Sequence, residues 1–330
     1  MGGDFAPEME VGAALEASKA SDLHIVLYGK EAEIRRFLPN GQPPPNISIV
    51  HADDVIGMAD EASTIVKSRK QSSLYLGLDD LRERKIQAFI SAGNTGAVMA
   101  TATMLCGRIK GVGRPTIGTF MPTESGGSTL VVDAGANVDS KPQFLRDFGV
   151  MGSVYTELML KKPRPTIGLL NVGEERGKGT ATVKEAYELL ESSGINFVGN
   201  VEGRDILKGT VDVVVCDGFE GNIVLKFAES ILGFLKARFK AYADQGVLQR
   251  LLIGAFKPVF KKILRGMDYQ EYGGVPLLGV NGVVIIGHGS STVAALNNMI
   301  NKAVEMVQLK VNDRIEQAIA LTTNTTETSS

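Results

Sequence analysis

Three times along this chain, a short apolar run ends in a glycine-rich polar turn and then continues as a helical pattern. The turns are Ser91–Ala97, Asp217–Asn222 and His288–Ser291. Glycine lets the backbone approach an anion closely, and the free N–H groups at a helix start face that anion with a favourable dipole. None of the turns carries a nucleophile beside a base, or a set of metal ligands. The pattern therefore predicts a protein that binds phosphate rather than one that attacks a substrate with its own side chain.

Apolar strand-like segments alternate with amphipathic helical patterns, such as residues 31–38, 143–161 and 182–192. Continuous Val/Ile/Leu runs are typical of strands buried on both faces of a parallel sheet. We therefore expect a single α/β domain over residues 1–330, with a doubly wound, three-layer α/β/α arrangement and a mostly parallel sheet. Ligands in such folds bind beyond the carboxyl ends of the strands, where the three turns fall. The strand-like segments are residues 22–29, 46–53, 85–92, 128–135, 165–173, 195–201, 211–218 and 282–287.

Both ends of the chain depart from this regular alternation. Met1–Glu8 reads MGGDFAPE, like another polar turn that opens a helix, but no strand precedes it. Because a βαβ fold begins with a strand at this point, we interpret the chain as truncated or numbered from an internal methionine. At the other end, Thr322–Ser330 is rich in Thr and Ser, and we expect a disordered tail.

Composition excludes several classes of protein. With 330 residues and 44% hydrophobic content, the chain is expected to be soluble and to bury a sizeable core. Cys106 and Cys216 lie far apart in apolar runs, which argues against a disulfide framework and indicates a reducing cytosol. Cys216, inside an apolar run, is interpreted as a buried, inert thiol. No signal peptide or bilayer-spanning stretch is apparent. Residues 236–265 carry eight basic side chains and one acid, Asp244, which predicts one basic limb rather than a nucleic-acid-binding surface.

Two nucleotide-binding motifs are excluded by their spacing. The segment NVGEERGKGT, residues 171–180, resembles a P-loop but is one residue short, and Gly179 stands where the Mg²⁺-binding hydroxyl is needed. No G-x-G-x-x-G follows a strand with an acidic residue about twenty positions later, so a Rossmann dinucleotide site is unsupported. What remains is Lys178 on a glycine-rich turn at the ligand end of the sheet, and its alternative interpretation is a solvated loop lysine.

Acidic and amide side chains in one turn resemble half of a metal site. They are Asp133, Asn137 and Asp139. Since no matching cluster occurs elsewhere, we interpret them as turn and cap residues, and the sequence predicts neither a metal nor a cofactor.

Ten motifs, taken together and in order, resemble those of the bacterial phosphate acyltransferases. They are MGGDFAP, HADD, SAGNTGA, GRIKGVGRP, VVDAGANVDSKP, MGSVY, GLLNVG, FVGNVEGRD, DGFEGN and GHGSS. The resemblance runs from Met1 to Val307. It implies transfer of a fatty acyl group from acyl carrier protein to inorganic phosphate, giving acyl phosphate for membrane phospholipid synthesis. It also implies a homodimer, a fold similar to those of isocitrate- and isopropylmalate-type dehydrogenases and phosphotransacetylases, and a short strand before MGGD.

This resemblance gives Lys178 and Asn222 catalytic roles, because they match positions taken as catalytic in the family. A reaction in which phosphate attacks a thioester needs a phosphate cradle and donors for the developing oxyanion. A lysine and an amide suit these tasks, although Asn222 can also be read as an ordinary helix cap. The side chains and glycines expected to surround phosphate or substrate are Ser91, Gly93, Asn94, Thr95, Gly96, Asp217, Gly218, Gly221, His288, Ser290 and Ser291.

The basic limb is predicted to form a protruding helical hairpin over residues 222–268. One helix is expected over Asn222–Ala243 and a second over Val247–Arg265. Apolar and basic side chains together are typical of contact with anionic lipid, so we expect a cytoplasmic protein that associates peripherally with membranes. The same surface suits the acidic acyl carrier protein, and packing in the core or a dimer interface is the plainer alternative. The contact residues are Leu251, Leu252, Phe256, Lys257, Lys261 and Lys262.

Two other functions stay open at this point. A decarboxylating dehydrogenase on the same fold would need a metal-binding aspartate cluster and a set of substrate-binding arginines, and neither is apparent in the sequence. A non-enzymatic, membrane-peripheral binder of phosphate or lipid would show no turnover with an acyl carrier protein thioester and phosphate.

Overall fold

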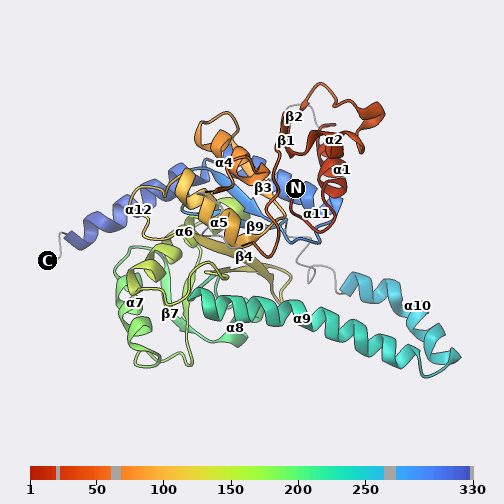
Figure 1. The fold of residues 1–330 in the computed structure, drawn as a ribbon. Helices are drawn as coiled ribbons and strands as arrows, with labels where there is room; N and C mark the ends of the chain where they lie inside the picture. The colour runs from red at the N-terminus through yellow and green to blue at the C-terminus, as the bar shows by residue number, and fades with distance from the viewer. Residues whose placement is uncertain (20–22, 61–67, 264–272, 328–330) are drawn as a thin grey trace.

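An eight-stranded sheet crosses the molecule, and a separate two-stranded sheet lies near the N-terminus (Figure 1). The computed structural model describes residues 1–19, 23–60, 68–263 and 273–327. The strands are β1 (Ile25–Gly29), β2 (Ile47–His51), β3 (Ala88–Ser91), β4 (Thr116–Pro122), β5 (Ser128–Val132), β6 (Ile167–Leu170), β7 (Phe197–Val201), β8 (Val213–Val215), β9 (Val275–Leu278) and β10 (Val283–Ile286).

Helices connect the strands and cover both faces of the large sheet. They are α1 (Glu8–Ala17), α2 (Glu31–Arg35), the short 3₁₀ turn η1 (Pro39–Gly41), α4 (Ser73–Arg82), α5 (Thr95–Leu105), α6 (Pro142–Leu160), α7 (Ala181–Glu191), α8 (Gly203–Lys208), α9 (Gly218–Ala243), α10 (Val247–Ile263), α11 (Val293–Gln308) and α12 (Val311–Glu327). This is the expected α/β architecture with a mostly parallel sheet flanked by helices.

The large sheet has the order β3-β10-β9-β4-β5-β8-β6-β7 and is parallel at both ends but antiparallel in the middle. β3 pairs in parallel with β10, and β5, β8, β6 and β7 form a second parallel group. β9 and β4 join the two groups through three antiparallel pairings. Because three reversals separate β3 from β8, the two parallel groups run in opposite directions. The carboxyl ends of β3 and β10 therefore lie at one edge of the sheet, and that of β8 lies at the other.

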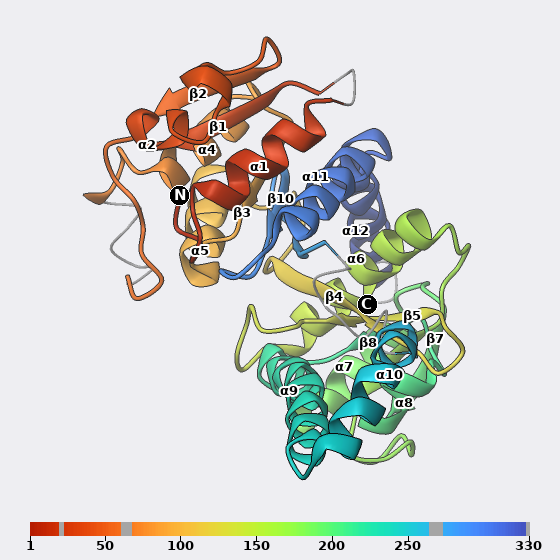
Figure 2. The same cartoon turned by 90° about the vertical axis from the view of Figure 1, so that its right-hand side faces the viewer.

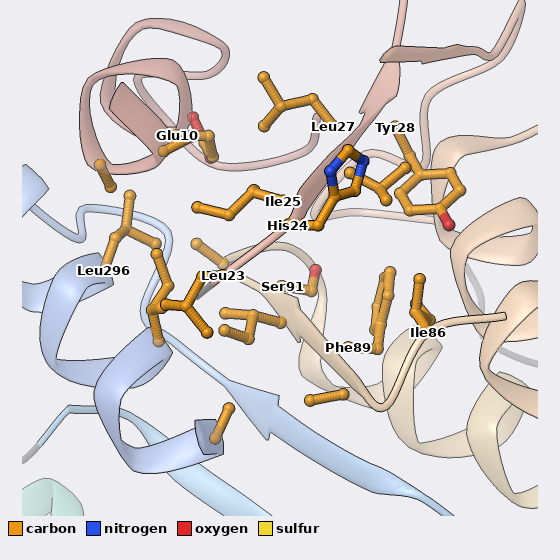
Figure 3. A pocket seen from close by; sticks show the side chains of 18 of the residues that line it. Glu10, Leu23, His24, Ile25, Leu27, Tyr28, Ile86, Phe89, Ser91 and Leu296 are labelled. Carbon is orange, nitrogen blue, oxygen red and sulfur yellow. The ribbon is translucent and has the colours of Figure 1, made fainter. Parts of the chain in front are cut away.

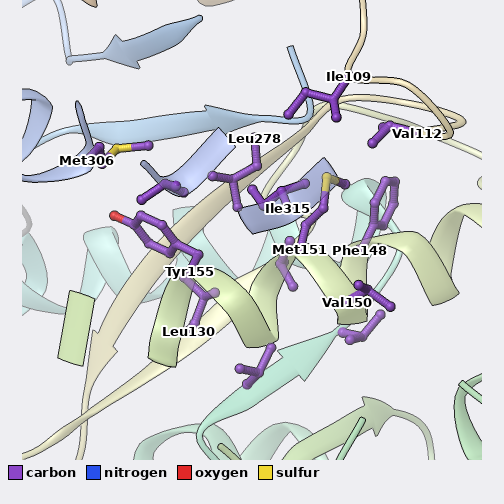
Figure 4. Packing of buried hydrophobic residues seen from close by; sticks show 14 of the residues in the cluster. Ile109, Val112, Leu130, Phe148, Val150, Met151, Tyr155, Leu278, Met306 and Ile315 are labelled. Atoms are coloured by element: carbon purple, nitrogen blue, oxygen red, sulfur yellow. The ribbon is translucent and has the colours of Figure 1, made fainter. Parts of the chain in front are cut away.

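Side chains from the sheet enter a hydrophobic core on each face. Leu130 and Val132 of β5 belong to one cluster, whereas Val131 between them belongs to another, as the two-residue period of a strand requires. The largest cluster lies beneath α6, α7, α11 and α12. Figure 4 shows Phe148 and Tyr155 on the face of α6 that points toward Leu278 and Ile315. α4, α5, α8 and part of α9 cover the opposite face.

The two-stranded sheet is separated from the edge of the large sheet by an apolar cavity of about 480 Å³. β1 pairs in parallel with β2 and β3 pairs with β10, and the described residues show no pairing between β1 and β3. Figure 3 shows Ile25 and Leu27 of β1 on one side of the cavity and Phe89 of β3 on another. α1 and α11 close the remaining sides. The expectation of a strand ahead of Met1 stays a prediction.

The strands expected from the sequence are present, with differences at two places. The two antiparallel central strands, β4 and β9, were not expected. Residues 322–327, expected to begin a disordered tail, are the last turns of α12. The physical reason is that this helix is anchored by Ile315, Ile319 and Thr322, whose side chains are buried.

The predicted hairpin is formed by α9 and α10, which extend away from the sheet (Figures 1 and 2). α9 begins at Gly218, four residues earlier than expected, and runs for 26 residues. Stacked Phe239 and Phe260 rings, with centroids 4.6 Å apart, hold the two helices together. Arg265 and residues 264–268 at the end of the predicted hairpin lie outside the described residues.

Candidate active site

A cleft of about 930 Å³ lies between α5 and α9, over the antiparallel centre of the sheet. Its floor is formed by Ile117 and Thr119 of β4, Val275 of β9 and Ile286 of β10. Because the floor spans the junction between the two parallel groups, the cleft reaches turns that follow strands of opposite direction. All three glycine-rich turns contribute to its lining. The predicted site residues that line it are Gly93, Thr95, Gly96, Asn222, His288 and Ser291.

The first turn starts α5 and is held by its asparagine. The Asn94 side-chain oxygen accepts a hydrogen bond from the Ala97 N–H at 3.0 Å, which makes Asn94 the N-cap. Its amide nitrogen donates to the carbonyls of Met58 and Asp60, both at 3.0 Å, so this side chain ties α5 to the 57–60 loop. Ser91 accepts from the Gly93 N–H at 3.1 Å within the turn. Neither Asn94 nor Ser91 is among the residues that line the cleft.

The third turn carries the histidine that the sequence placed at the site. The His288 Nδ1 atom lies 2.8 Å from the Ser290 hydroxyl and accepts from the Ser290 N–H at 3.2 Å. The Ser291 hydroxyl donates to the His288 carbonyl at 2.6 Å. The Asp4 N–H donates to the Gly289 carbonyl at 2.8 Å, which fixes the N-terminal turn beside this one. His288, Ser291 and Asp4 line the cleft, and Ser290 is not among its lining residues.

The second turn is built into the packing of α9. One oxygen of Asp217 accepts from the Phe219 N–H at 2.8 Å as the N-cap, and the other accepts from the Ser140 N–H at 2.7 Å. A Cβ atom added to Gly221 would overlap the carbonyl oxygen of Asp133, and one added to Gly218 would overlap backbone atoms of Asn137, in the loop after β5. These contacts account for Asp217, Gly218 and Gly221 without a ligand, and none of the three lines the cleft.

The loop after β5 supports the start of α9. The Asp133 carboxylate accepts hydrogen bonds from the backbone N–H groups of Ala136 and Asn137 at 2.8 and 2.7 Å, and from the Asn137 side chain at 2.7 Å. Burial raises the pKa of Asp133, and these bonds oppose that rise. Its interpretation as a turn residue is therefore confirmed. The Asn137 amide also donates to the Pro115 carbonyl at 2.8 Å and so links this loop to the one before β4.

Asn222 lies on the first turns of α9 and faces the cleft. Its Oδ1 lies 3.2 Å from the position of a Cβ atom added to Gly135, so the absence of a side chain at Gly135 makes room for it. The described residues show no hydrogen bond from the Asn222 side chain, which leaves its amide available to a ligand. The helix cap is Asp217, so the capping role considered for Asn222 is wrong.

Lys178 does not line this cleft. It is exposed in the loop after β6, where its N–H donates to the Glu175 carbonyl at 3.0 Å and its carbonyl accepts from Asn171 at 3.1 Å. Lys178 therefore lies outside the lining of the cleft that Asn222 faces, and its catalytic role stays a prediction.

Several polar side chains at the cleft were not expected from the sequence. The charged or amide-bearing ones are Asp4, Arg114, Asn137, Lys226 and Glu229. Lys226 could have been predicted from the helical period. It follows Asn222 by four residues, so the two side chains lie on the same face of α9. Arg114 belongs to the motif GRIKGVGRP, one of the ten that carry the family resemblance.

The cysteines lie away from any activating group. Burial raises the pKa of the Cys106 thiol to about 11. Cys216 is buried, its Sγ donates to the Asp133 carbonyl at 3.3 Å, and burial raises its pKa further. Both are therefore protonated near neutral pH, and the interpretation of Cys216 as a buried, inert thiol is confirmed. In the part of the chain that the structure describes, no group of His, Cys, Asp or Glu could hold a metal ion.

The second helix of the hairpin, α10, is exposed. Leu251, Leu252 and Phe256 have exposed fractions of 66%, 42% and 52%, and Lys257 and Lys262 are also exposed. The side chain of Lys261 lies outside the described part of the structure. Among the described helices, none has both the length and the apolar character needed to cross a bilayer.

Sequence comparison identifies the class of protein to which this cleft belongs. A family described as fatty acid synthesis protein matches residues 1–314. Proteins named phosphate acyltransferase are similar over nearly the whole length: that of Dictyoglomus turgidum is 44% identical over 321 residues, covering 97% of this chain and 96% of the relative. That of Halothermothrix orenii is 45% identical over 323 residues, with the same coverage of both chains. The chain therefore belongs to the phosphate acyltransferase family, which is a family of enzymes.

Structural comparison agrees on the fold. The EutD phosphotransacetylase from Staphylococcus aureus superimposes with a TM-score of 0.62, covering 91% of each chain at 15% sequence identity. At this level of identity the likeness shows the fold alone, and it confirms the expected similarity to phosphotransacetylases.

Proposed function

We propose that this protein transfers a fatty acyl group from acyl carrier protein to inorganic phosphate and releases acyl phosphate for membrane phospholipid synthesis. Family membership supports acyl transfer to phosphate. The observation that carries the proposal is the cleft, where the start of α5, the third turn and Asn222 converge. Backbone N–H groups at a helix start and a side-chain amide are the donors that an oxyanion or a phosphate requires.

Phosphate is the nucleophile in this reaction. One phosphate oxygen forms a bond to the thioester carbonyl carbon, and the carbonyl oxygen becomes an oxyanion. The tetrahedral intermediate then collapses, the C–S bond breaks, and the thiol of the carrier leaves as a thiolate with a reference pKa near ~8.5. The enzyme thus has to bind an anion and stabilise a second negative charge, without forming a covalent bond itself.

The side chains at the site are assigned on this basis. Asn222 donates its unused amide N–H groups to the oxyanion or to phosphate. The first turns of α5, at Thr95 and Gly96, face the anion with the positive end of the helix dipole. Lys178 is the second catalytic group implied by the family resemblance. It would have to reach the cleft by a movement of its loop or from a second copy of the chain.

The test of the activity is direct. Purified protein is incubated with acyl carrier protein thioester and phosphate, and acyl phosphate is sought by mass spectrometry and trapped with hydroxylamine. A product that depends on both substrates supports the proposal. Absence of product from folded protein, with thioester intact, would favour the binder hypothesis instead.

We further propose that the hairpin makes the contacts with acyl carrier protein and with anionic membrane. Leu251, Leu252, Phe256 and Lys257 are exposed along α10, and Lys262 is exposed near the end of the same helix, so apolar insertion and charge attraction act together. The apolar face nearer the body suits a dimer interface, since Ile223, Phe227 and Phe234 are 52%, 68% and 64% exposed.

Vesicle binding separates these roles. Leu251→Glu with Leu252→Glu places two charges on the inserting face and should abolish binding to anionic vesicles, while wild-type protein should bind and be released at high salt. Val198→Glu with Leu207→Glu, two exposed apolar positions away from the hairpin, is the matched control. If the hairpin variant loses its dimer, measured by light scattering, these leucines are interface residues and the membrane role is wrong.

A further inference from the structure

Two cationic side chains at the cleft have no role in the reaction as assigned so far. Among the described residues that line it, arginine and lysine occur once each, as Arg114 and Lys226. The acidic lining residues are Asp4 and Glu229. Inorganic phosphate carries between one and two negative charges near neutral pH, so neutral donors alone leave most of its charge uncompensated.

Lys226 is placed by helix α9. It lies four residues after Asn222, so both side chains project from the same face of the helix into the cleft. Its ammonium group pairs with the Glu229 carboxylate at 2.9 Å. The Glu229 side chain is only 21% exposed, whereas that of Lys226 is 57% exposed. Glu229 therefore holds the ammonium group at the cleft wall while leaving much of it open to a ligand.

Arg114 is placed by a different element. It precedes β4, and the carbonyl of the next residue, Pro115, accepts the hydrogen bond from Asn137. Its guanidinium carbon lies 5.9 Å from the centroid of the Phe144 ring, a contact that orients the group but uses none of its N–H donors. Within the described residues, the Arg114 side chain has no hydrogen bond or ion pair. An arginine at a cleft with five unused donors is suited to a phosphate.

We propose that Arg114 and Lys226 form a two-cation clamp that binds the phosphate nucleophile beside Asn222. This inference rests on the proposed function, and it adds the groups that bind the second substrate. It also assigns different roles to the cations: the clamp sets the affinity for phosphate, whereas Lys178 serves the chemical step. Arg114 and Lys226 touch the nucleophile, and Glu229 is a positioning residue that acts through Lys226.

The experiment measures phosphate affinity and turnover separately in Arg114→Ala, Lys226→Ala and the conservative Lys226→Arg. Binding of inorganic phosphate is followed by calorimetry, and KM for phosphate and for the acyl donor by product formation. Each alanine variant should weaken phosphate binding and raise KM for phosphate by about tenfold or more, the usual effect of removing a hydrogen bond to a charged group. KM for the acyl donor should stay within about twofold of wild type, and Lys226→Arg should recover much of the loss.

Arg238→Ala and Lys240→Ala are matched controls, because both are exposed cations on α9 that do not line the cleft. They should leave phosphate affinity unchanged. Folded clamp variants that bind phosphate as wild type does would overturn the clamp, even if acyl phosphate forms. A third outcome separates the two proposals: wild-type protein forms no acyl phosphate but binds phosphate, and the clamp variants do not bind it. In that case the clamp is supported and the proposed reaction is wrong.

Discussion

The first and second glycine-rich turns share one sequence pattern but use it differently. Each follows a strand, and each starts a helix with a side-chain cap, Asn94 for α5 and Asp217 for α9. At the first turn, the glycines Gly93 and Gly96 line the cleft. At the second, Gly221 packs against the carbonyl of Asp133 and lies outside it. Glycine thus leaves room for a ligand in one turn and for a neighbouring backbone in the other.

This difference decides what each turn offers to a substrate. The first turn offers its backbone, including the N–H groups at the start of α5. The second turn has its glycines and its aspartate engaged in packing and capping, so α9 offers side chains further along, among them Asn222 and Lys226. Four predictions test the comparison, from the largest expected effect to the smallest.

Gly221→Ala should break the second turn. The added methyl group would overlap a backbone oxygen that cannot move without shifting the loop after β5, so the free energy of unfolding should fall by about 4 kcal/mol or more, or the protein should fail to fold. Denaturant unfolding and the yield of folded protein measure the effect. Gly93→Ala is the control, because its methyl group would meet a side-chain oxygen of Ser91 at 3.3 Å and should cost no more than about 1 kcal/mol. Equal losses in the two variants would remove the distinction.

Asn222→Ala should separate function from packing on α9. Since the described residues show no hydrogen bond from this side chain, stability should change little, while turnover should fall by about 10²-fold, as when one oxyanion donor is removed. Lys178→Ala should cause a similar loss if its loop reaches the site. Wild-type rates in folded Lys178→Ala protein would return that residue to the solvated-loop interpretation.

Asn94→Ala should weaken the first turn without breaking it. The substitution removes the cap of α5 and the bonds to the Met58 and Asp60 carbonyls, and the free energy of unfolding should fall by about 2 kcal/mol. Asn94→Asp keeps the cap but not the donors, so it should recover only part of the loss. Denaturant unfolding of the two variants measures the two contributions separately. Unchanged stability in both would show that the Asn94 side chain stabilises neither the start of α5 nor its contact with the 57–60 loop.

No covalent intermediate should form at Cys216, beside the second turn, or at Cys106. Burial raises both thiol pKa values, so neither supplies a thiolate near neutral pH. Protein incubated with acylated carrier protein, but without phosphate, should keep its intact mass. A stoichiometric acyl adduct on either cysteine would contradict direct attack by phosphate.

Much of the fold could be predicted because buried parallel strands give continuous apolar runs, as in Val213–Val215 and Val283–Ile286. The two central antiparallel strands gave no such run. Thr116–Pro122 contains Thr, Gly and Pro, and Val275–Leu278 is short and contains Pro276. Because these two strands were not predicted, the reversal of strand direction across the sheet could not be predicted either.

A site residue could be predicted only where its position after a strand end also placed its side chain or backbone at the cleft. Asn222 and Thr95 follow strand ends, and the cleft includes them. Asp217 and Gly221 have the same local pattern, but packing uses them, and sequence spacing cannot distinguish the two outcomes. Arg114 reaches the cleft through a loop before an unexpected strand, so no local signal marked it.

Helix α9 is fixed at its start, beside the cleft, and free of the body at its far end. Its first turn is fixed by the bonds of Asp217 and the contact of Gly221, while its far end leaves the body. At a rise of about 1.5 Å per residue, its 26 residues place that end about 39 Å away. A tilt of about 5° would move the tip by about 3 Å but Asn222 by less than about 1 Å, given that same rise. A change in the tilt of α9 would therefore reposition the hairpin tip while the site keeps its geometry.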